Sequence, residues 1–174
     1  MAPVAICTLT SNELIGVLSA FPGVAISGRV YTVNLGIEKI ILNITANPSI
    51  RFLLLCGKES PIFHPGQALL ALARDGVTSE HRILGARGHL PVLSNISLNS
   101  IERFRRQIEV IDRIGETSIE AVGEVARDLA ARGLDVFAES NDEREPGLSL
   151  EHSEKLGVRL YRDSPRWQAE AISL

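Results

Sequence analysis

The sequence predicts an α/β domain with a mostly parallel sheet and helices on both faces. Two observations lead to this fold class. Short apolar runs alternate along the chain with longer amphipathic ones, which is the pattern of strands joined through helices. One of these runs, Arg51–Cys56, is followed by Gly57 and is apolar at successive positions, as expected of a central strand covered on both faces.

Local signals place the elements of the first half of the chain. Pro3–Leu9 is predicted as a buried first strand, and the spacing Thr10-Ser-Asn-Glu13 is that of a capping box that opens a helix. Val24–Tyr31 is predicted as a second, shorter strand. Asn34 is a favourable N-cap for a helix over Leu35–Ala46, in which isoleucines spaced at helical intervals form one apolar stripe.

The later elements follow in the same way. Pro65 suits the first position of a helix that ends at Asp75-Gly76, and Arg82–Gly85 is predicted as a brief fourth strand. Two more helices are expected: one capped by Asn99 or Ser100, with Ile101, Phe104, Ile108 and Ile111 facing inward, and one from a second capping box, Thr117-Ser-Ile-Glu120, to about Arg132.

The 174 residues suit one domain, predicted here as residues 1–137, with residues 138–174 as a C-terminal extension. Its first part, Asn141–Gly147, is polar and charged and is interpreted as a surface connector. Val158–Tyr161 is a possible late strand of this extension. We expect the core of the protein to lie in the first region.

Composition limits the classes of function. Apolar residues at 45% and charged residues at 22% are typical of a globular chain, and a net charge of −3 with 5% aromatics does not favour nucleic acid as a partner. Cys7 and Cys56 each end an apolar run and are interpreted as buried thiols. No signal-like N-terminus and no membrane-length apolar run is present, so a cytoplasmic protein is expected.

In open α/β sheets, ligands bind beyond the carboxyl ends of the strands. Three glycine-containing turns are expected there, and helix-start amides beside them could receive an anionic or amide-rich ligand. Neither a dinucleotide fingerprint, a phosphate-binding loop nor a nucleophile elbow occurs. The sequence therefore predicts a small-cofactor site at this edge, with no catalytic residue assigned.

His64 is the candidate metal ligand, because it follows the central strand directly before a predicted helix start. A role as acid or base remains an alternative. His81 and His89 flank the next turn, but no pair has the tight spacing typical of a three-histidine zinc site. Glu38 and Glu59 lie near the same edge, where either could orient an imidazole.

Several segments together resemble a known family, that of the A subunit of tetrahydromethanopterin S-methyltransferase. The resemblance covers about residues 20–115 and rests on an ordered set of motifs: Asn34-Leu-Gly-Ile-Glu-Lys39, Cys56-Gly57, Gly66-Gln67, Gly85-Ala-Arg-Gly88 and Ile101-Glu-Arg-Phe-Arg-Arg-Gln107. As a group these motifs are fairly specific.

The resemblance implies a Rossmann-like, three-layer domain that binds cobalamin or a related cobamide, with a loop histidine as the lower ligand of cobalt. Such a protein carries a methyl group on cobalt between a methyl-pterin and an acceptor, together with other methyltransferase subunits. The residues implied to bind the corrinoid are Asn34, Leu35, Gly36, Glu38, Gly57, Gly66, Gln67, Gly85, Ala86 and Gly88, with His64 at the metal.

The chain departs from the family pattern in two respects. The pattern places the histidine four residues before the glutamine of Gly-Gln, whereas His64 stands three before Gln67 and Phe63 takes the matching place. The archaeal members also have a C-terminal membrane anchor that is not found here, so we expect a soluble relative, one that could use a folate-type pterin.

Two other classes of function stay open. The chain could be a non-catalytic scaffold or interaction domain that has lost the cofactor, or a small metal-dependent hydrolase. A homo-oligomer is also possible. The methyl donor and acceptor are not identified by the sequence.

Overall fold

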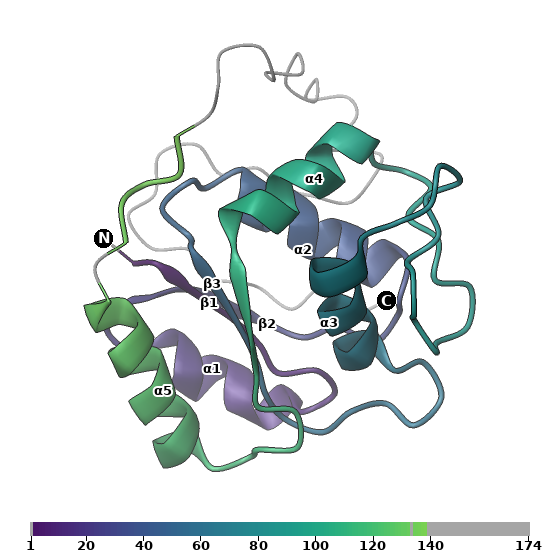
Figure 1. Cartoon of the computed structure of the whole chain (residues 1–174). Coiled ribbons are helices and arrows are strands. Elements are labelled where there is room, and N and C mark those ends of the chain that lie inside the picture. The colour runs from purple at the N-terminus through teal and green to yellow at the C-terminus, as the bar shows by residue number, and fades with distance from the viewer. Residues whose placement is uncertain (1, 133, 139–174) are drawn as a thin grey trace, which may run out of the picture. The chain divides into compact units, whose positions relative to one another are not determined.

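The computed structural model describes residues 2–132 and 134–138 and confirms the predicted fold class. In this part of the chain four strands form one parallel sheet in the order β2-β1-β3-β4 (Figure 1). The strands are β1 (Val4–Cys7), β2 (Val24–Gly28), β3 (Phe52–Leu55) and β4 (Glu109–Asp112).

The helices cover both faces of the sheet, which gives three layers (Figure 1). One face is covered by α1 (Ile15–Ser19), which follows a short 3-10 turn (Asn12–Leu14), and by α5 (Ile119–Ala131). The other face is covered by α2 (Leu35–Thr45), α3 (Pro65–Asp75) and α4 (Leu98–Gln107).

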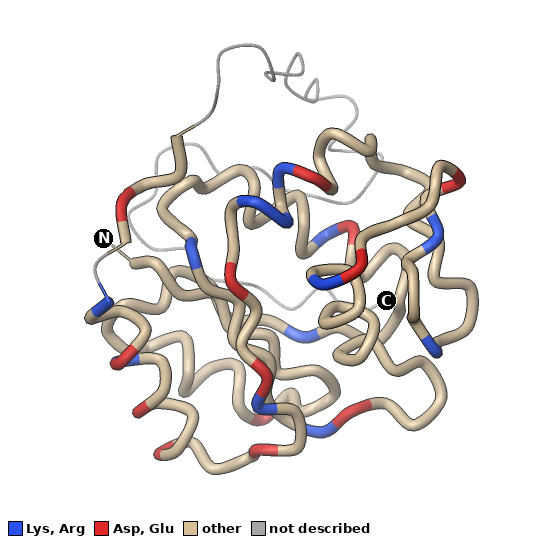
Figure 2. The backbone as a smooth tube through the Cα atoms, viewed as in Figure 1, with Lys and Arg blue, Asp and Glu red and all other residues tan. Residues whose placement is uncertain are grey.

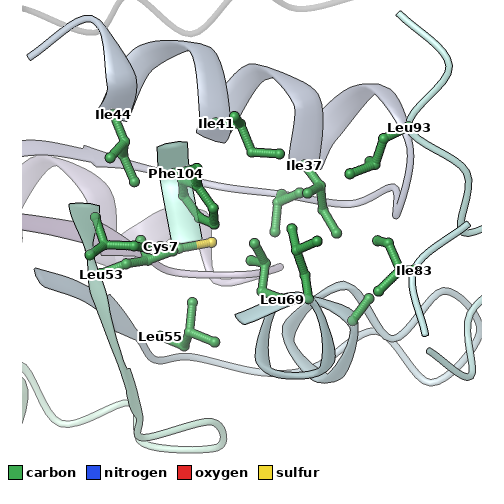
Figure 3. Close-up of a cluster of buried hydrophobic side chains, with 14 of the residues drawn as sticks. Cys7, Ile37, Ile41, Ile44, Leu53, Leu55, Leu69, Ile83, Leu93 and Phe104 are labelled. Atoms are coloured by element: carbon green, nitrogen blue, oxygen red, sulfur yellow. The ribbon is translucent and has the colours of Figure 1, made fainter. Parts of the chain in front are cut away.

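Two apolar clusters form the core, one on each face of the sheet. Alternation along β3 supplies both, since Leu53 and Leu55 face α2, whereas Phe52 and Leu54 face α1 and α5. The α2 stripe of Ile37, Ile41 and Ile44 packs on the first of these faces (Figure 3). β3 is therefore buried on both sides, as its apolar run predicts.

By internal contacts the chain divides into two compact units, Met1–Phe137 and Ala138–Leu174. All the helices and strands above belong to the first. The predicted connector at Asn141–Gly147 and the predicted strand at Val158–Tyr161 lie outside the described residues.

Arg51 fastens the segment that follows α5. Its Nε donates to the carbonyl of Gln107 at 2.8 Å and its Nη1 to that of Asp135 at 2.5 Å, and its guanidinium lies 5.7 Å from the ring centroid of Phe137. The Phe137 amide also donates to the carbonyl of Pro48 at 3.0 Å. Residues 135–137 are thereby joined to the start of β3, at the amino-terminal edge of the sheet.

Three helix starts agree with their sequence signals. The Asn34 side chain accepts from the Leu35 amide at 2.8 Å, and Pro65 is the first residue of α3. At α5 the cap is Ser118, one residue after the predicted Thr117. The predicted capping box at Thr10 is wrong, because the Thr10 hydroxyl donates to the carbonyl of Lys58 and a 3-10 turn precedes the short α1.

Two predictions between α3 and α5 are also wrong. Arg82–Gly85 is not a strand of the sheet, since Arg82 and Ile83 form only isolated antiparallel bridges with Val92 and Val77. Ile111 is not on the helix face: α4 ends at Gln107, and Ile111 lies in β4. Helical spacing from Ile108 to Ile111 concealed this short fourth strand.

Candidate functional site

The carboxyl edge of the sheet has one topological switch point, between β1 and β3. The loop after β1 leads to α1 on one face, and the loop after β3 leads to α3 on the other. In sheets of this strand order the ligand crevice lies between two such diverging loops. The contacts of these loops therefore decide where a ligand has access.

The two loops are hydrogen bonded to each other across the switch point. The Thr10 amide donates to the carbonyl of Lys58 at 3.1 Å, and the Lys58 amide donates to the Ser11 hydroxyl at 3.1 Å. Gly57 has φ +75°, and a Cβ there would overlap the carbonyl oxygen of Thr8. Glycine is required at residue 57 because the chain itself approaches so closely.

Gly57 also joins the loop after β4. Its amide donates to the carbonyl of Glu116 at 2.6 Å, and its carbonyl accepts from the Gly115 amide at 2.8 Å. The loops after β1, β3 and β4 thus meet at one glycine. This junction accounts for Gly57 without a ligand, and the exposed surface nearest to it belongs to the later part of the β3 loop.

Glu59 closes the amino-terminal end of α3. Its carboxylate accepts from the Gly66 amide at 3.3 Å and from the Gln67 amide at 2.8 Å, and also from its own neighbour Ser60 at 3.0 Å. Pro65 has no amide hydrogen to offer. The expectation that helix-start amides are free for an anionic ligand is therefore wrong for α3, because a carboxylate of this chain already binds them.

His64 is the N-cap of α3 and is half-buried. Its backbone lies in the left-handed region, at φ 47° and ψ 47°, which is uncommon for a residue with a side chain. The His64 amide donates to the carbonyl of Ser60 at 3.1 Å, and its carbonyl accepts from the Ala68 amide at 3.0 Å. Within the described chain its imidazole has no hydrogen-bond partner, so both ring nitrogens remain available.

Three segments meet beside His64, and Gly88 is the residue at which they meet. A Cβ at residue 88 would overlap the carbonyl oxygen of Phe63 and would lie 2.7 Å from a methyl group of Val33. Phe63 precedes His64, and Val33 precedes the Asn34 cap of α2. The structure therefore brings the predicted residues Asn34–Gly36, Gly66-Gln67 and Gly85–Gly88 into one region around the histidine loop.

The glycines of this region are explained by close packing within the chain. Gly36 lies against Val30 and Thr32, and its amide donates to the Thr32 hydroxyl at 3.1 Å. A Cβ at Gly66 would lie 2.8 Å from Glu59 Oε2 and from Ile114 Cδ1. These small residues permit the loops to touch one another, and that function is sufficient to require them.

Glu38 has a different environment from the one expected. It is 3% exposed, and its two carboxylate oxygens accept from the backbone amide and from the side-chain Nδ2 of Asn95, both at 2.9 Å. Glu38 therefore ties α2 to the segment that leads into α4. Its partner, Asn95, carries no sequence signal that distinguishes it from other loop asparagines.

Exposed apolar side chains lie on the three segments that meet at Gly88. Ile62 is 70% exposed, Leu90 57%, Leu35 50% and Phe63 37%. We call these four residues the apolar rim. Sequence reasoning missed them as a group, although two large apolar residues in the loop before His64 were a usable signal.

The other two candidate histidines have separate environments. His81 Nδ1 lies 2.9 Å from the carbonyl oxygen of Leu93, which occupies that ring nitrogen, and His89 is exposed. Within residues 2–132 and 134–138 no group of three or more His, Cys, Asp or Glu side chains is placed to hold a metal ion. The structure thus gives a three-histidine zinc site no support.

Charges of both signs alternate over the described chain (Figure 2). No broad surface of one sign surrounds the histidine loop, so recognition there depends on local contacts and not on long-range attraction. No helix in the described residues combines the length and the apolar character needed to cross a membrane.

Together, the parallel sheet and the loop-borne histidine define a Rossmann-like α/β domain whose carboxyl edge presents an imidazole beside an apolar rim. Residues 1–142 match the family of the A subunit of tetrahydromethanopterin S-methyltransferase. The chain belongs to this family, as its motifs predict.

Relatives from methanogenic archaea agree. The chain is 44% identical over 124 residues to the second of two tetrahydromethanopterin S-methyltransferase A subunits of Methanothermobacter marburgensis, and the match covers 71% of this chain and 66% of the relative. It is 40% identical over 130 residues to the A subunit of "Putative methyltransferase Mtx" of Methanosarcina acetivorans, covering 75% of this chain and 64% of the relative. The chain thus spans about two thirds of the length of these relatives.

Proposed function

We propose that this chain is the corrinoid-binding subunit of a methyltransferase that uses a methyl-pterin. The observation that carries the proposal is His64: a half-buried imidazole, without a hydrogen-bond partner in the described chain, at the carboxyl edge of the sheet. Membership in the methyltransferase family supports the same function.

The residues present fit a corrinoid in two respects. An imidazole nitrogen is a suitable axial ligand for a transition metal, and both ring nitrogens of His64 are available. The apolar rim offers Leu35, Ile62, Phe63 and Leu90 to a large macrocycle with apolar faces. A corrinoid, when bound, would supply the chemistry of methyl transfer.

The protein's own contribution is to hold and orient. His64 would supply the lower ligand, and its left-handed backbone is kept in place by the Ser60 carbonyl behind it and by helix α3 after it. Glu59 holds the first turn of α3 against this loop. The start of α2 and the Gly85–Gly88 loop would border the ring, while other subunits would deliver and accept the methyl group.

A second candidate function is a scaffold that has lost the cofactor, and one observation favours it. Close packing within the chain accounts for Gly36, Gly57, Gly66 and Gly88, so none of them requires a ligand. In this function the apolar rim would contact a protein partner. The two candidates differ in a single measurable property, the binding of a corrinoid.

The test is visible spectroscopy of the full chain mixed with hydroxocobalamin, with the affinity measured by calorimetry. We expect a spectral change that is lost in His64→Ala and kept in His89→Ala, an exposed histidine that serves as the matched control. A wild-type chain that stays folded without binding would favour the scaffold. Binding with a spectrum unchanged in His64→Ala would remove His64 from the role.

The shifted register of the loop allows a second variant. Phe63→His with His64→Ala moves the imidazole to the place that the family pattern implies, four residues before Gln67. If the loop tolerates either position, the double variant should regain part of the spectral change that His64→Ala loses. If only residue 64 is suitable, the double variant should resemble His64→Ala.

A further inference from the structure

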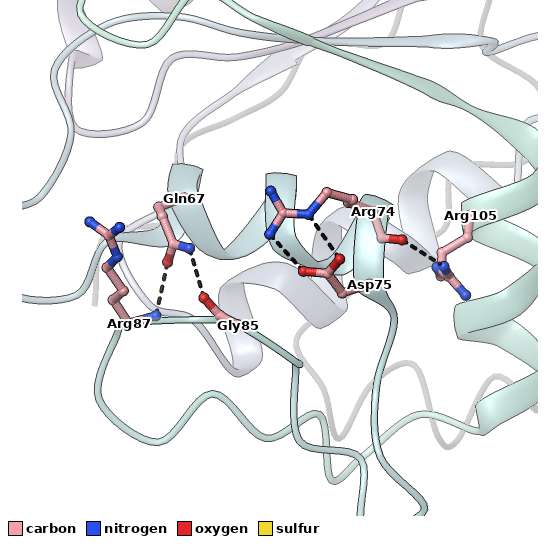
Figure 4. Close-up of polar contacts among 6 residues, drawn as sticks. All are labelled: Gln67, Arg74, Asp75, Gly85, Arg87 and Arg105. Carbon is pink, nitrogen blue, oxygen red and sulfur yellow. Dashed lines mark hydrogen bonds and ion pairs between the residues drawn. The ribbon is translucent and has the colours of Figure 1, made fainter.

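Gln67 makes a two-point contact that its place on α3 alone does not require. Its Nε2 donates to the carbonyl of Gly85 at 2.9 Å, and its Oε1 accepts from the Arg87 amide at 2.9 Å (Figure 4). One side-chain amide therefore pairs with both backbone groups of the Gly85–Gly88 loop, as a neighbouring strand would. Both polar atoms of Gln67 have a partner, so neither has to be supplied with one by a ligand.

The loop that Gln67 holds lies directly against the histidine loop. Gly88 follows Arg87 by one residue and packs on the carbonyl of Phe63, which precedes His64. The other side of Gly88 contacts Val33 at the start of α2. The position of the Gly85–Gly88 loop therefore limits how far residues 63 and 64 can move.

His64 needs such a limit because its left-handed backbone is unfavourable for a residue with a Cβ. The Ser60 carbonyl and the first turn of α3 restrain it within its own loop. Gly88 is the contact from outside that loop, and Gln67 sets the place of Gly88. A contiguous path of contacts thus leads from the Gln67 amide to the backbone of His64.

We propose that Gln67 is a positioning residue, which fixes the His64 imidazole through the Gly85–Gly88 loop and does not itself contact a cofactor. The meaning of this role for corrinoid binding rests on the proposed function. The positioning itself does not, because it concerns only residues of this chain and can be measured without a ligand.

The experiment uses NMR on the ligand-free full chain, with Gln67→Ala compared with wild type. Asn43→Ala is the matched control, because Asn43 is an exposed helix amide without a hydrogen bond in the described residues. We expect Gln67→Ala to accelerate hydrogen exchange of the Arg87 amide and to shift or broaden the His64 ring resonances. Asn43→Ala should change neither.

Gln67→Glu tests the two halves of the contact separately. A carboxylate still accepts from the Arg87 amide but cannot donate to the Gly85 carbonyl. We expect Arg87 to keep part of its protection and the His64 ring resonances to move less than in Gln67→Ala. His64 ring resonances that stay within the range of Asn43→Ala in both Gln67 variants would overturn the proposal, as would unchanged exchange of Arg87 in Gln67→Ala.

A second arm uses hydroxocobalamin. Outer residues that orient a metal ligand typically change metal affinity roughly 10- to 100-fold when removed, and we expect a weakening of that order in Gln67→Ala. A wild-type chain that does not bind hydroxocobalamin would contradict the proposed function and leave the NMR result to decide on Gln67. Unchanged affinity in Gln67→Ala, with wild-type binding intact, would count against the positioning role.

Discussion

Gly88 lies so close to the carbonyl of Phe63 that a Cβ at residue 88 would overlap that oxygen. The contact joins the Gly85–Gly88 loop to the loop that carries His64. Neither loop belongs to a helix or strand at this point, so a single backbone contact connects two otherwise separate parts of the carboxyl edge.

Gly88→Ala should therefore destabilise the protein by about 1–3 kcal/mol, because the added methyl group has to displace a backbone oxygen and a Val33 methyl group. The measurement is the free energy of unfolding in urea. Gly28→Ala is the matched control: it is also a glycine near this edge, but no atom lies within 4 Å of its added Cβ. Equal stability of the Gly88→Ala and Gly28→Ala variants would contradict the close contact.

Glu59→Ala should destabilise the start of α3, since the Gly66 and Gln67 amides lose their acceptor. A loss of about 1–2 kcal/mol is expected in urea unfolding, typical of a removed helix cap. Glu59→Gln should lose less, because an amide oxygen still accepts while the favourable charge at the helix end is removed. Glu13→Gln, an exposed carboxylate, should leave the stability unchanged.

Glu38→Ala should cost about 1.5–3 kcal/mol, since it removes hydrogen bonds to a buried charged acceptor and leaves two donors of Asn95 without it. Thermal unfolding is a suitable measurement. Glu38→Gln keeps the shape but directs an NH₂ group at one of these donors, so it should be destabilising as well. Glu124→Gln, on the exposed face of α5, is the control; equal effects at both positions would argue against the Asn95 contact.

The two cysteines predict a loss of stability at high pH. Burial raises the pKa of Cys7 and of Cys56 from 9.0 to about 12. The unfolded chain therefore releases these protons from about pH 9 upward, while the folded chain keeps them. Their contribution is fully present below pH 9 and is lost as the pH rises from about 9 to about 12, at most about 1.4 kcal/mol per pH unit for each thiol.

Urea unfolding at pH 8 and pH 10 measures this effect. Other groups also titrate in that range, so the informative quantity is the difference between wild type and the double variant Cys7→Ala with Cys56→Ala. We expect stability to fall more steeply for wild type, by up to about 1.4 kcal/mol per thiol between those pH values. Parallel curves would mean that the thiols already ionise in the folded chain.

Sequence reasoning succeeded where one local signal determines a structure. The apolar run of β3, the Asn34 cap and Pro65 at the start of α3 each act within a few residues. It failed at β4, because Ile108 and Ile111 also fit a helical stripe and the four residues of the strand have charged ends. Only pairing with β3 distinguishes the two possibilities.

The candidate site shows the same division. Glycine-containing turns predicted the correct edge and brought attention to His64, because strand ends and turns are readable locally. The partners were not readable: Glu59 reaches amides seven and eight residues away, and Glu38 reaches Asn95 across 57 positions. Such contacts depend on how loops cross in space. For that reason the glycines, interpreted as space for a ligand, were found to give room to other loops.

The Arg51 contacts have a practical consequence for shortening the chain. Arg51 holds the backbone of Asp135 and the ring of Phe137, so removal of everything after Arg132 would leave its Nη1 without that carbonyl and its cation without an aromatic cover. A fragment ending at residue 138 would retain both. The end of α5 is therefore a poor place to cut, and the natural limit of the folded unit lies a few residues beyond it.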